Sequence, residues 1–145
     1  MQTVAALLLV PALFAIPATA QDEERPSFNG TWQFDASKSE VHGKITRATW
    51  VIEEGDNSIH ITETENGKAK KLELQCTTDG KECKLAGDRR ASFWYNGPML
   101  VEMETRFEHV TRFRMKISDG GKTLTVEIAH IVPQDDKIDT MVFQK

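Results

Sequence analysis

The side chains that could perform acid–base or metal chemistry include four histidines and two cysteines, and none of them stands in a recognised catalytic pattern. The sequence has no Gly-x-Ser-x-Gly nucleophile elbow, no His-Glu-x-x-His zinc motif and no glycine-rich phosphate loop. His130 shares the alternation of Leu124, Val126 and Ile128, so it is expected to face inward, as a core histidine or as a polar contact in a ligand pocket. We therefore predict no catalytic residue, no metal site and no cofactor, and we expect that the protein is not an enzyme.

Cys76 and Cys83 predict a disulfide. A turn at Asp79-Gly80 would place the two side chains opposite each other on adjacent strands. In an exported protein this Cys-x6-Cys spacing indicates a disulfide, and it differs from the Cys-x2-Cys spacing of zinc or thioredoxin-like redox sites. Two inward-facing free thiols are the alternative.

The first twenty residues predict an export signal. They carry no charged side chain and end in Ala18-Thr19-Ala20, the small-residue pattern that signal peptidase requires. A membrane anchor is the alternative, which two prolines and a short apolar run disfavour. We predict a signal peptide at 1–20 with cleavage after Ala20, a periplasmic or secreted location and no stable membrane anchor. A disordered N-terminal arm at 21–27 and one domain at 28–145 are expected to follow.

The charge pattern argues against nucleic acid as a partner. The net charge is −4, and the acidic and basic residues are interspersed rather than gathered in blocks. Phosphate binding needs a concentrated basic surface. Arg89 and Arg90 are adjacent, but the preceding Gly87-Asp88 indicates a solvated loop there.

Short alternating runs separated by turn sequences predict an all-β protein. The expected strands lie near 30–35, 45–54, 58–65, 69–77, 82–86, 91–95, 99–107, 111–118, 122–132 and 138–144. Every connection is short except the one between residues 35 and 45. The fold class predicted is therefore an antiparallel up-and-down meander of about 8–10 strands closed into a lipocalin-like barrel. A twisted two-sheet sandwich with the same strand order is the alternative.

Turn positions predict the strand registers, if apolar residues lie opposite apolar residues. A turn at Gly55-Asp56 pairs Ile52 with Ile59, and one at Gly120-Gly121 pairs Met115 with Val126. A three-residue loop at 108–110 pairs Met103 with Met115. This last register leaves Glu102 and Glu104 on the outer face, beside Lys116 and Arg114.

The resulting inner face could line a pocket. About eight strands would leave an interior filled by side chains, whereas ten would favour a cavity. Whether the interior is hollow or packed stays open at this stage. The candidate ligand-binding residues are Trp50, Met103, Phe107, Phe113, Met115 and His130. Phe93-Trp94-Tyr95 stands beside a further turn, either as core-edge packing or as a binding lip.

The stretch Phe28-Asn29-Gly30-Thr31-Trp32 resembles the G-x-W start of the calycin superfamily, which includes lipocalins and fatty-acid-binding proteins. With Asp79-Gly80-Lys81 and the ending Met141-Val142-Phe143-Gln144-Lys145, the chain is similar to small secreted bacterial lipocalin-like proteins over essentially all of its mature length. The resemblance implies a barrel plugged by a buried Trp32, and it brings no known ligand. A typical lipocalin pairs this tryptophan with a late arginine, and no such arginine can be singled out here.

These observations predict an exported, monomeric, lipocalin-like protein that binds a small hydrophobic ligand inside its barrel. Two alternatives remain open. One is a periplasmic inhibitor or accessory protein that acts through its surface and its N-terminal arm. The other is an uncharacterised enzyme with its site at the barrel mouth.

Overall fold

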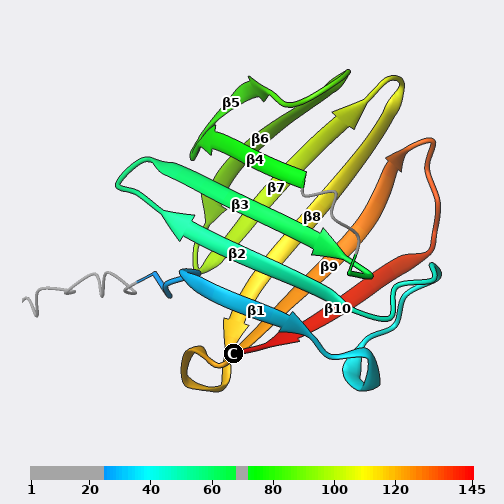
Figure 1. Ribbon diagram of the computed structural model, residues 1–145. Coiled ribbons are helices and arrows are strands. Elements are labelled where there is room, and N and C mark those ends of the chain that lie inside the picture. The colour runs from blue at the N-terminus through cyan, green and yellow to red at the C-terminus, as the bar shows by residue number, and fades with distance from the viewer. Residues whose placement is uncertain (1–24, 68–71) are drawn as a thin grey trace, which may run out of the picture.

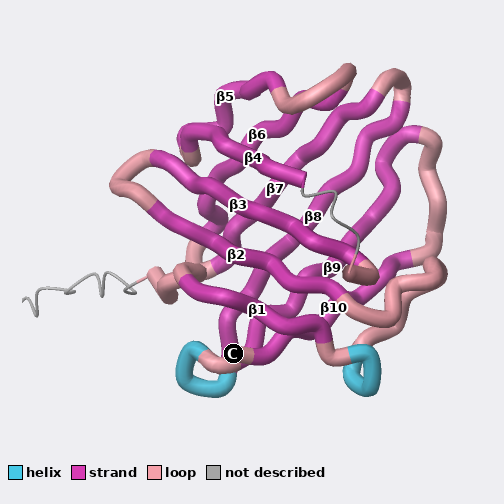
Figure 2. Tube along the Cα trace, viewed as in Figure 1, coloured by secondary structure: helices cyan, strands magenta, loops and turns pink. Residues whose placement is uncertain are grey.

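The computed structural model describes residues 25–67 and 72–145, which form antiparallel strands arranged as a nearly closed barrel (Figure 1). Short 3-10 turns, η1 (Ala36–Lys38) and η2 (Asp119–Gly121), interrupt the connections (Figure 2). The strands are β1 (Gly30–Phe34), β2 (Ala48–Glu54), β3 (Ser58–Glu65), β4 (Leu72–Thr77), β5 (Asp79–Lys84), β6 (Arg89–Asn96), β7 (Met99–Arg106), β8 (His109–Ser118), β9 (Thr123–Val132) and β10 (Ile138–Gln144). The predicted all-β meander is confirmed. The predicted signal peptide and residues 21–24 of the predicted arm lie outside the described residues.

The sheet closes through its first and last strands. β1 pairs with β10, so the strand order is β4-β3-β2-β1-β10-β9-β8-β7-β6-β5. The two edges are β4 and β5, and β5 pairs with β6, so the hairpin ladder predicted between β4 and β5 is wrong. The short connection between them nevertheless brings Cys76 and Cys83 together, with Cα atoms 5.6 Å apart, and the predicted disulfide is confirmed. The bridge therefore links the two edges that the sheet leaves unpaired.

For two of the predicted strand pairs, the residues expected on the inner face of the barrel do lie there. β8 and β9 pair as expected, with Met115 opposite Val126. β2 and β3 differ from the prediction by two residues, because Ile52 lies opposite Ile61 rather than Ile59. Side chains alternate with a period of two, so this shift leaves the same residues inside the barrel.

The register predicted between β7 and β8 is wrong in a way that reverses one face. The loop is a two-residue turn at Phe107-Glu108, and Leu100, not Met103, lies opposite Met115. Phe107 adopts a φ of 53°, a left-handed conformation that non-glycine residues rarely take, so the sequence carries no turn signal there. The odd offset moves Met103 to the outer face and Glu102 to the inner face.

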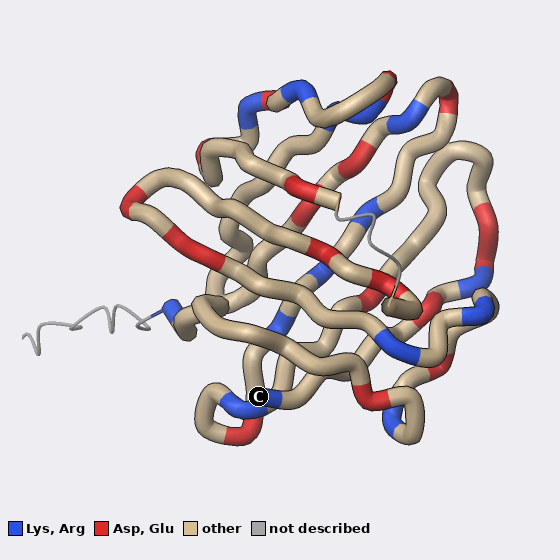
Figure 3. The backbone as a smooth tube through the Cα atoms, in the orientation of Figure 1, with Lys and Arg blue, Asp and Glu red and all other residues tan. Residues whose placement is uncertain are grey.

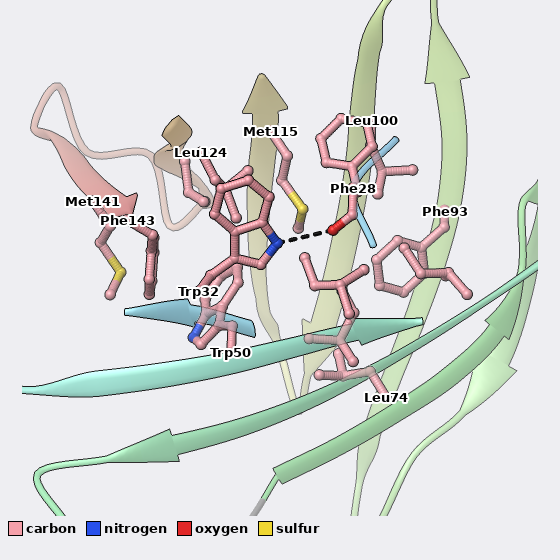
Figure 4. Close-up of a cluster of buried hydrophobic side chains, with 14 of the residues drawn as sticks. Phe28, Trp32, Trp50, Leu74, Phe93, Leu100, Met115, Leu124, Met141 and Phe143 are labelled. Carbon is pink, nitrogen blue, oxygen red and sulfur yellow. Dashed lines mark hydrogen bonds between the residues drawn. The ribbon is translucent and has the colours of Figure 1, made fainter. Parts of the chain in front are cut away.

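One half of the barrel interior is solidly packed. Trp32 is fully buried among apolar side chains from facing strands, and its Nε1 donates a hydrogen bond of 2.8 Å to the carbonyl of Phe28 (Figure 4). Fully buried neighbours in this cluster include Phe93, Leu100, Met115, Leu124 and Phe143. Phe93 thus belongs to the core rather than to an exposed lip. Burial of this apolar area is the main stabilising contribution to such a fold.

The positions of the charged residues are spread along strands and turns, without a large block of one sign (Figure 3). Arg89 departs from its expected place in a solvated loop, because it begins β6 and is only partly exposed. None of the helical turns in residues 25–67 and 72–145 has the length and apolar character needed to span a membrane.

Candidate ligand site inside the barrel

The other half of the interior is hollow. A cavity of about 390 Å³ opens toward the end of the barrel that carries the β1–β2 and β3–β4 connections. Its wall combines apolar and ionisable side chains, namely Ile45, Ala48, Trp50, Glu63, Thr64, Glu65, Asn66, Leu72, Arg89, Phe113, Ile128 and Met141. The interior is therefore packed at the Trp32 end and hollow at the other.

Strand pairing explains why these side chains meet. Trp50 on β2 lies opposite Glu63 on β3, and Phe113 on β8 lies opposite Ile128 on β9. Because Cβ atoms alternate between the two faces of a strand, each pair points into the barrel together. Met141 lies on β10, next to β9, and completes the apolar wall.

A layer of ionisable side chains crosses the barrel at the level of the cavity. Glu63 on β3 alternates with the buried Ile59 and Ile61, so it shares their inner face. Glu102 on β7 lies opposite Phe113 and is 1% exposed. Glu104 follows on the same face of β7 and extends the layer toward the barrel mouth.

Arg89 forms a bidentate ion pair within this layer. Its Nη2 donates hydrogen bonds of 2.8 and 2.7 Å to Oε1 and Oε2 of Glu104, and its Nε donates a third of 3.0 Å to Oε1. The side chains of Arg89 and Glu104 are 20% and 13% exposed. The pair holds β6 and β7 together and commits the charge of the guanidinium to one carboxylate.

The two remaining interior carboxyl groups hold their protons to unusually high pH. Burial, and then the neighbouring charge of Glu104, raise the pKa of Glu63 from 4.5 to about 8, although Arg89 acts in the opposite direction. Burial raises the pKa of Glu102 well above its ordinary value, and the charges of Glu63 and Glu104 add to that effect. Glu102 Oε1 has no hydrogen-bond partner among the described residues. Within the described part of the chain, these two carboxyl groups thus lack a cation of their own.

The predicted ligand-binding residues fall into separate places. Trp50 and Phe113 line the cavity, whereas Met115 lies fully buried in the packed half. Met103 was expected inside and lies on the outer face of β7, because the β7–β8 register differs by an odd number of residues. Phe107 was also expected inside, but it occupies the β7–β8 turn and is 65% exposed.

His130 was expected to face the interior and instead lies exposed near the barrel rim. It lies opposite Thr111, as predicted, and its Nδ1 is 3.4 Å from the Thr111 hydroxyl. The strand alternation was correct, but β9 runs past the core here, so the inward face at this height is open to solvent. The structure therefore does not bring His130 together with Trp50 and Phe113.

The polar layer was not predicted from the sequence. For Glu63 the signal was present, since it continues the alternation of Ile59 and Ile61. For Glu102 and Glu104 the incorrect turn placed both residues outside. Arg89 was assigned to a loop because of the glycine and aspartate that precede it.

A basic partner for Trp32 was also missed, because it is a lysine at the end of the chain. The Nζ of Lys145 lies 4.6 Å from the centre of the Trp32 ring, a favourable cation–π position. Gly30 makes room for it: a Cβ there would lie 2.5 Å from Lys145 Cε, and the φ of Gly30 is +137°. Lys145 thus covers the tryptophan that closes the packed end.

Glu54 joins the N-terminal segment to the barrel at the packed end. Its carboxylate accepts hydrogen bonds of 2.8 Å from the Phe28 amide and 2.7 Å from the Tyr95 hydroxyl. Ser27 donates to the same carboxylate, and the Arg25 guanidinium lies 4.5 Å above the Tyr95 ring. Residues 25–28 are therefore held against β2 and β6. Within the described residues, no cluster of three or more histidine, cysteine or acidic side chains is arranged to hold a metal ion.

The fold is an antiparallel β-barrel meander that solved structures share. The chain is similar to the fluorescent protein UnaG, with a TM-score of 0.65 and 15% identity over 81% of this chain and 96% of that protein. It is also similar to a fatty-acid-binding protein isolated from Manduca sexta, with a TM-score of 0.60 and 17% identity over 81% of this chain and 98% of the other. A third similar structure is the fatty acid transporter REP1-NXSQ, with a TM-score of 0.61 and 14% identity over 81% and 94% of the two chains.

Sequence comparison adds no family to this likeness. No family model matches the chain, and no curated protein matches it significantly. Identities of 14–17% to the three solved structures show a shared fold alone.

Proposed function

We propose that this chain is an exported lipocalin-like protein that binds a small hydrophobic ligand inside its barrel. The observation that carries the proposal is the cavity of about 390 Å³, which lies within the size range of small-molecule pockets. Trp50, Phe113 and Met141 supply a large and adaptable apolar surface for a ligand. Two similar structures are named for fatty-acid binding or transport, which supports a role of this kind.

The open end of the barrel offers the route to the cavity. The β7–β8 and β9–β10 connections lie at this end, and large apolar side chains are exposed on or beside them. Phe107 is 65% exposed, Val132 46% and Ile138 49%. Exposed apolar side chains gathered at one end are typical of a surface that meets a hydrophobic molecule. We expect the ligand to enter between these connections.

Binding can be tested with the neutral fluorescent probe N-phenyl-1-naphthylamine. We expect saturable fluorescence enhancement with the wild-type protein and its loss in Ala48→Phe, because Ala48 is buried on the cavity wall and the larger ring fills the space. Thr49→Phe is the matched control, since Thr49 alternates with Ala48 and faces outward. A folded wild-type protein that takes up no probe would refute the proposal, as would equal binding by the two variants.

Export is tested separately. Expression of the full chain in a bacterial host should yield a periplasmic or secreted protein whose N-terminal sequence begins at Gln21. Recovery of an uncleaved chain in the membrane fraction would support the anchor alternative instead.

A further inference from the structure

The charges of the side chains inside the barrel indicate which class of ligand the cavity would bind. The cavity wall includes Glu63 and Glu65, and Arg89 is its one basic side chain among the described residues. Glu102 and Glu104 stand on the inner face of the neighbouring strand, next to this wall. Among residues 25–67 and 72–145, the interior therefore carries more acidic than basic groups.

Arg89 does not neutralise this excess. It makes hydrogen bonds to both oxygens of Glu104, at 2.8 and 2.7 Å, so its charge is already balanced. Among the described residues, no basic side chain pairs with Glu63 on β3 or with Glu102 on β7, and the charge of Glu63 acts on Glu102. A carboxylate brought into this space would further oppose the ionisation of both groups and would find no free cation among the described residues.

Glu102 also has an unmet hydrogen-bonding capacity. It is 1% exposed, and its Oε1 lacks a partner among the described residues. Its cross-strand neighbour Phe113 lines the cavity, so Glu102 lies on the inner face of the strand next to the cavity wall. Buried polar atoms in native proteins are nearly always paired, so this oxygen requires a donor that the described side chains do not supply.

We propose that the ligand is a cationic amphiphile, with a protonated amine between Glu63 and Glu102 and an apolar body against Trp50, Phe113 and Ile128. This inference rests on the proposed function, since it names the class of ligand for the same cavity. An ammonium group supplies hydrogen-bond donors to Glu102 and positive charge to both carboxylates. A fatty acid of the same length offers neither.

The elevated pKa values of the two carboxyl groups support the same assignment. Burial, and then repulsion between neighbouring carboxylates, raise the pKa of Glu63 to about 8 and the pKa of Glu102 well above its ordinary value, so both groups favour the protonated form. A bound cation favours the ionised form, so amine binding should release protons to the solvent. A neutral or anionic ligand would not release them.

The test is displacement of N-phenyl-1-naphthylamine by decylamine, decanol and decanoate at pH 7.5. We expect decylamine to compete at least tenfold better than either of the other two. Equal or better competition by decanol or decanoate overturns the inference while leaving the proposed function intact. Failure of the probe itself to bind a folded protein overturns the proposed function, so the two failures are distinguishable.

A pair of double variants assigns the effect to the interior carboxyl groups. Glu63→Gln with Glu102→Gln should retain probe binding and reduce the preference for decylamine over decanol to less than threefold. Glu73→Gln with Glu108→Gln removes the same formal charge from exposed positions on the outer face and in a turn, and should keep the preference unchanged. An unchanged preference in the interior variant, with probe affinity retained, overturns the assignment. If the interior variant does not fold, calorimetry on wild type decides, because decylamine binding without proton release also overturns it.

Discussion

The polar layer predicts how the stability of the protein depends on pH, and Glu63→Gln isolates one contribution to that dependence. The pKa of Glu63 is about 8 in the folded protein, because burial and Glu104 disfavour the carboxylate, and it is 4.5 in the absence of those effects. Between these two values the folded protein binds more protons than the unfolded chain. The free energy of unfolding therefore falls as the pH rises through this interval, and the stability contributed by the neutral group is complete below about pH 4.5.

The size of the effect follows from the same pKa values. At 1.36 kcal/mol for each pH unit, the difference between 4.5 and about 8 corresponds to an upper limit of about 5 kcal/mol. Glu63 is partly exposed on the cavity wall, which weakens the effect of burial, so we expect about 2–3 kcal/mol between pH 5 and pH 9. The groups that face Glu63 are Glu65 on its own strand, Arg89 on β6, and Glu102 and Glu104 on β7.

Urea denaturation followed by tryptophan fluorescence, at a series of pH values from 5 to 9, measures this effect. The wild-type protein should lose about 2–3 kcal/mol more than Glu63→Gln over this range. Glu73→Gln, on the exposed face of β4, should follow the wild-type profile. Parallel profiles for wild type and Glu63→Gln would show that Glu63 is already ionised in the folded protein at low pH, and the assignment of a neutral interior carboxyl group would be wrong.

Three further predictions concern the same framework. Arg89→Met leaves the partly buried Glu104 without its bidentate partner and should lower the free energy of unfolding by about 2–3 kcal/mol, measured by urea denaturation; a loss below 0.5 kcal/mol would mean that the pair behaves as an ordinary surface ion pair. Cys76→Ser with Cys83→Ser removes the bridge between the two sheet edges, and the short loop it closes predicts a loss of about 2–3 kcal/mol with the fold retained in circular dichroism spectra. Glu102→Met replaces a buried group that has an unpaired oxygen with an apolar side chain of similar size, so it should raise the free energy of unfolding by about 1–2 kcal/mol; a lower value would show that Glu102 stabilises the empty barrel.

The sequence was sufficient to predict the fold class and most of the strand order. Alternation of apolar residues and the positions of glycine, asparagine and aspartate define the strands and most of the turns between them. The β2–β3 register was wrong by two residues without consequence, since Ile52, Ile59 and Ile61 still face inward. A register that is wrong by an even number of residues leaves the same side chains on the inner face, so most of the predicted core remains correct.

The site was less predictable than the fold for a specific physical reason. The turn at Phe107 has no sequence signal, so the predicted register of β7 was wrong by an odd number of residues. The prediction placed Met103 on the inner face, where the structure has Glu102. Apolar matching across strands also assigns acidic residues to the outside by construction. This site consists of buried carboxyl groups. Pairing strands by their apolar residues therefore places these residues on the outer face.

The two halves of the barrel interior differ in what they contribute to the stability of the fold. The Trp32 end is closed by apolar packing, the Lys145 contact and the hydrogen bonds of Glu54, which together account for a stable fold. The polar layer at the cavity contributes little to that stability, because buried carboxyl groups without partners are unfavourable in an apolar interior. Residues that cost stability in the empty protein are typical of sites where a ligand later supplies the missing contacts. Glu102 is buried, and its Oε1 has no partner among the described residues, which is thus better explained by recognition of a donor-bearing ligand than by folding.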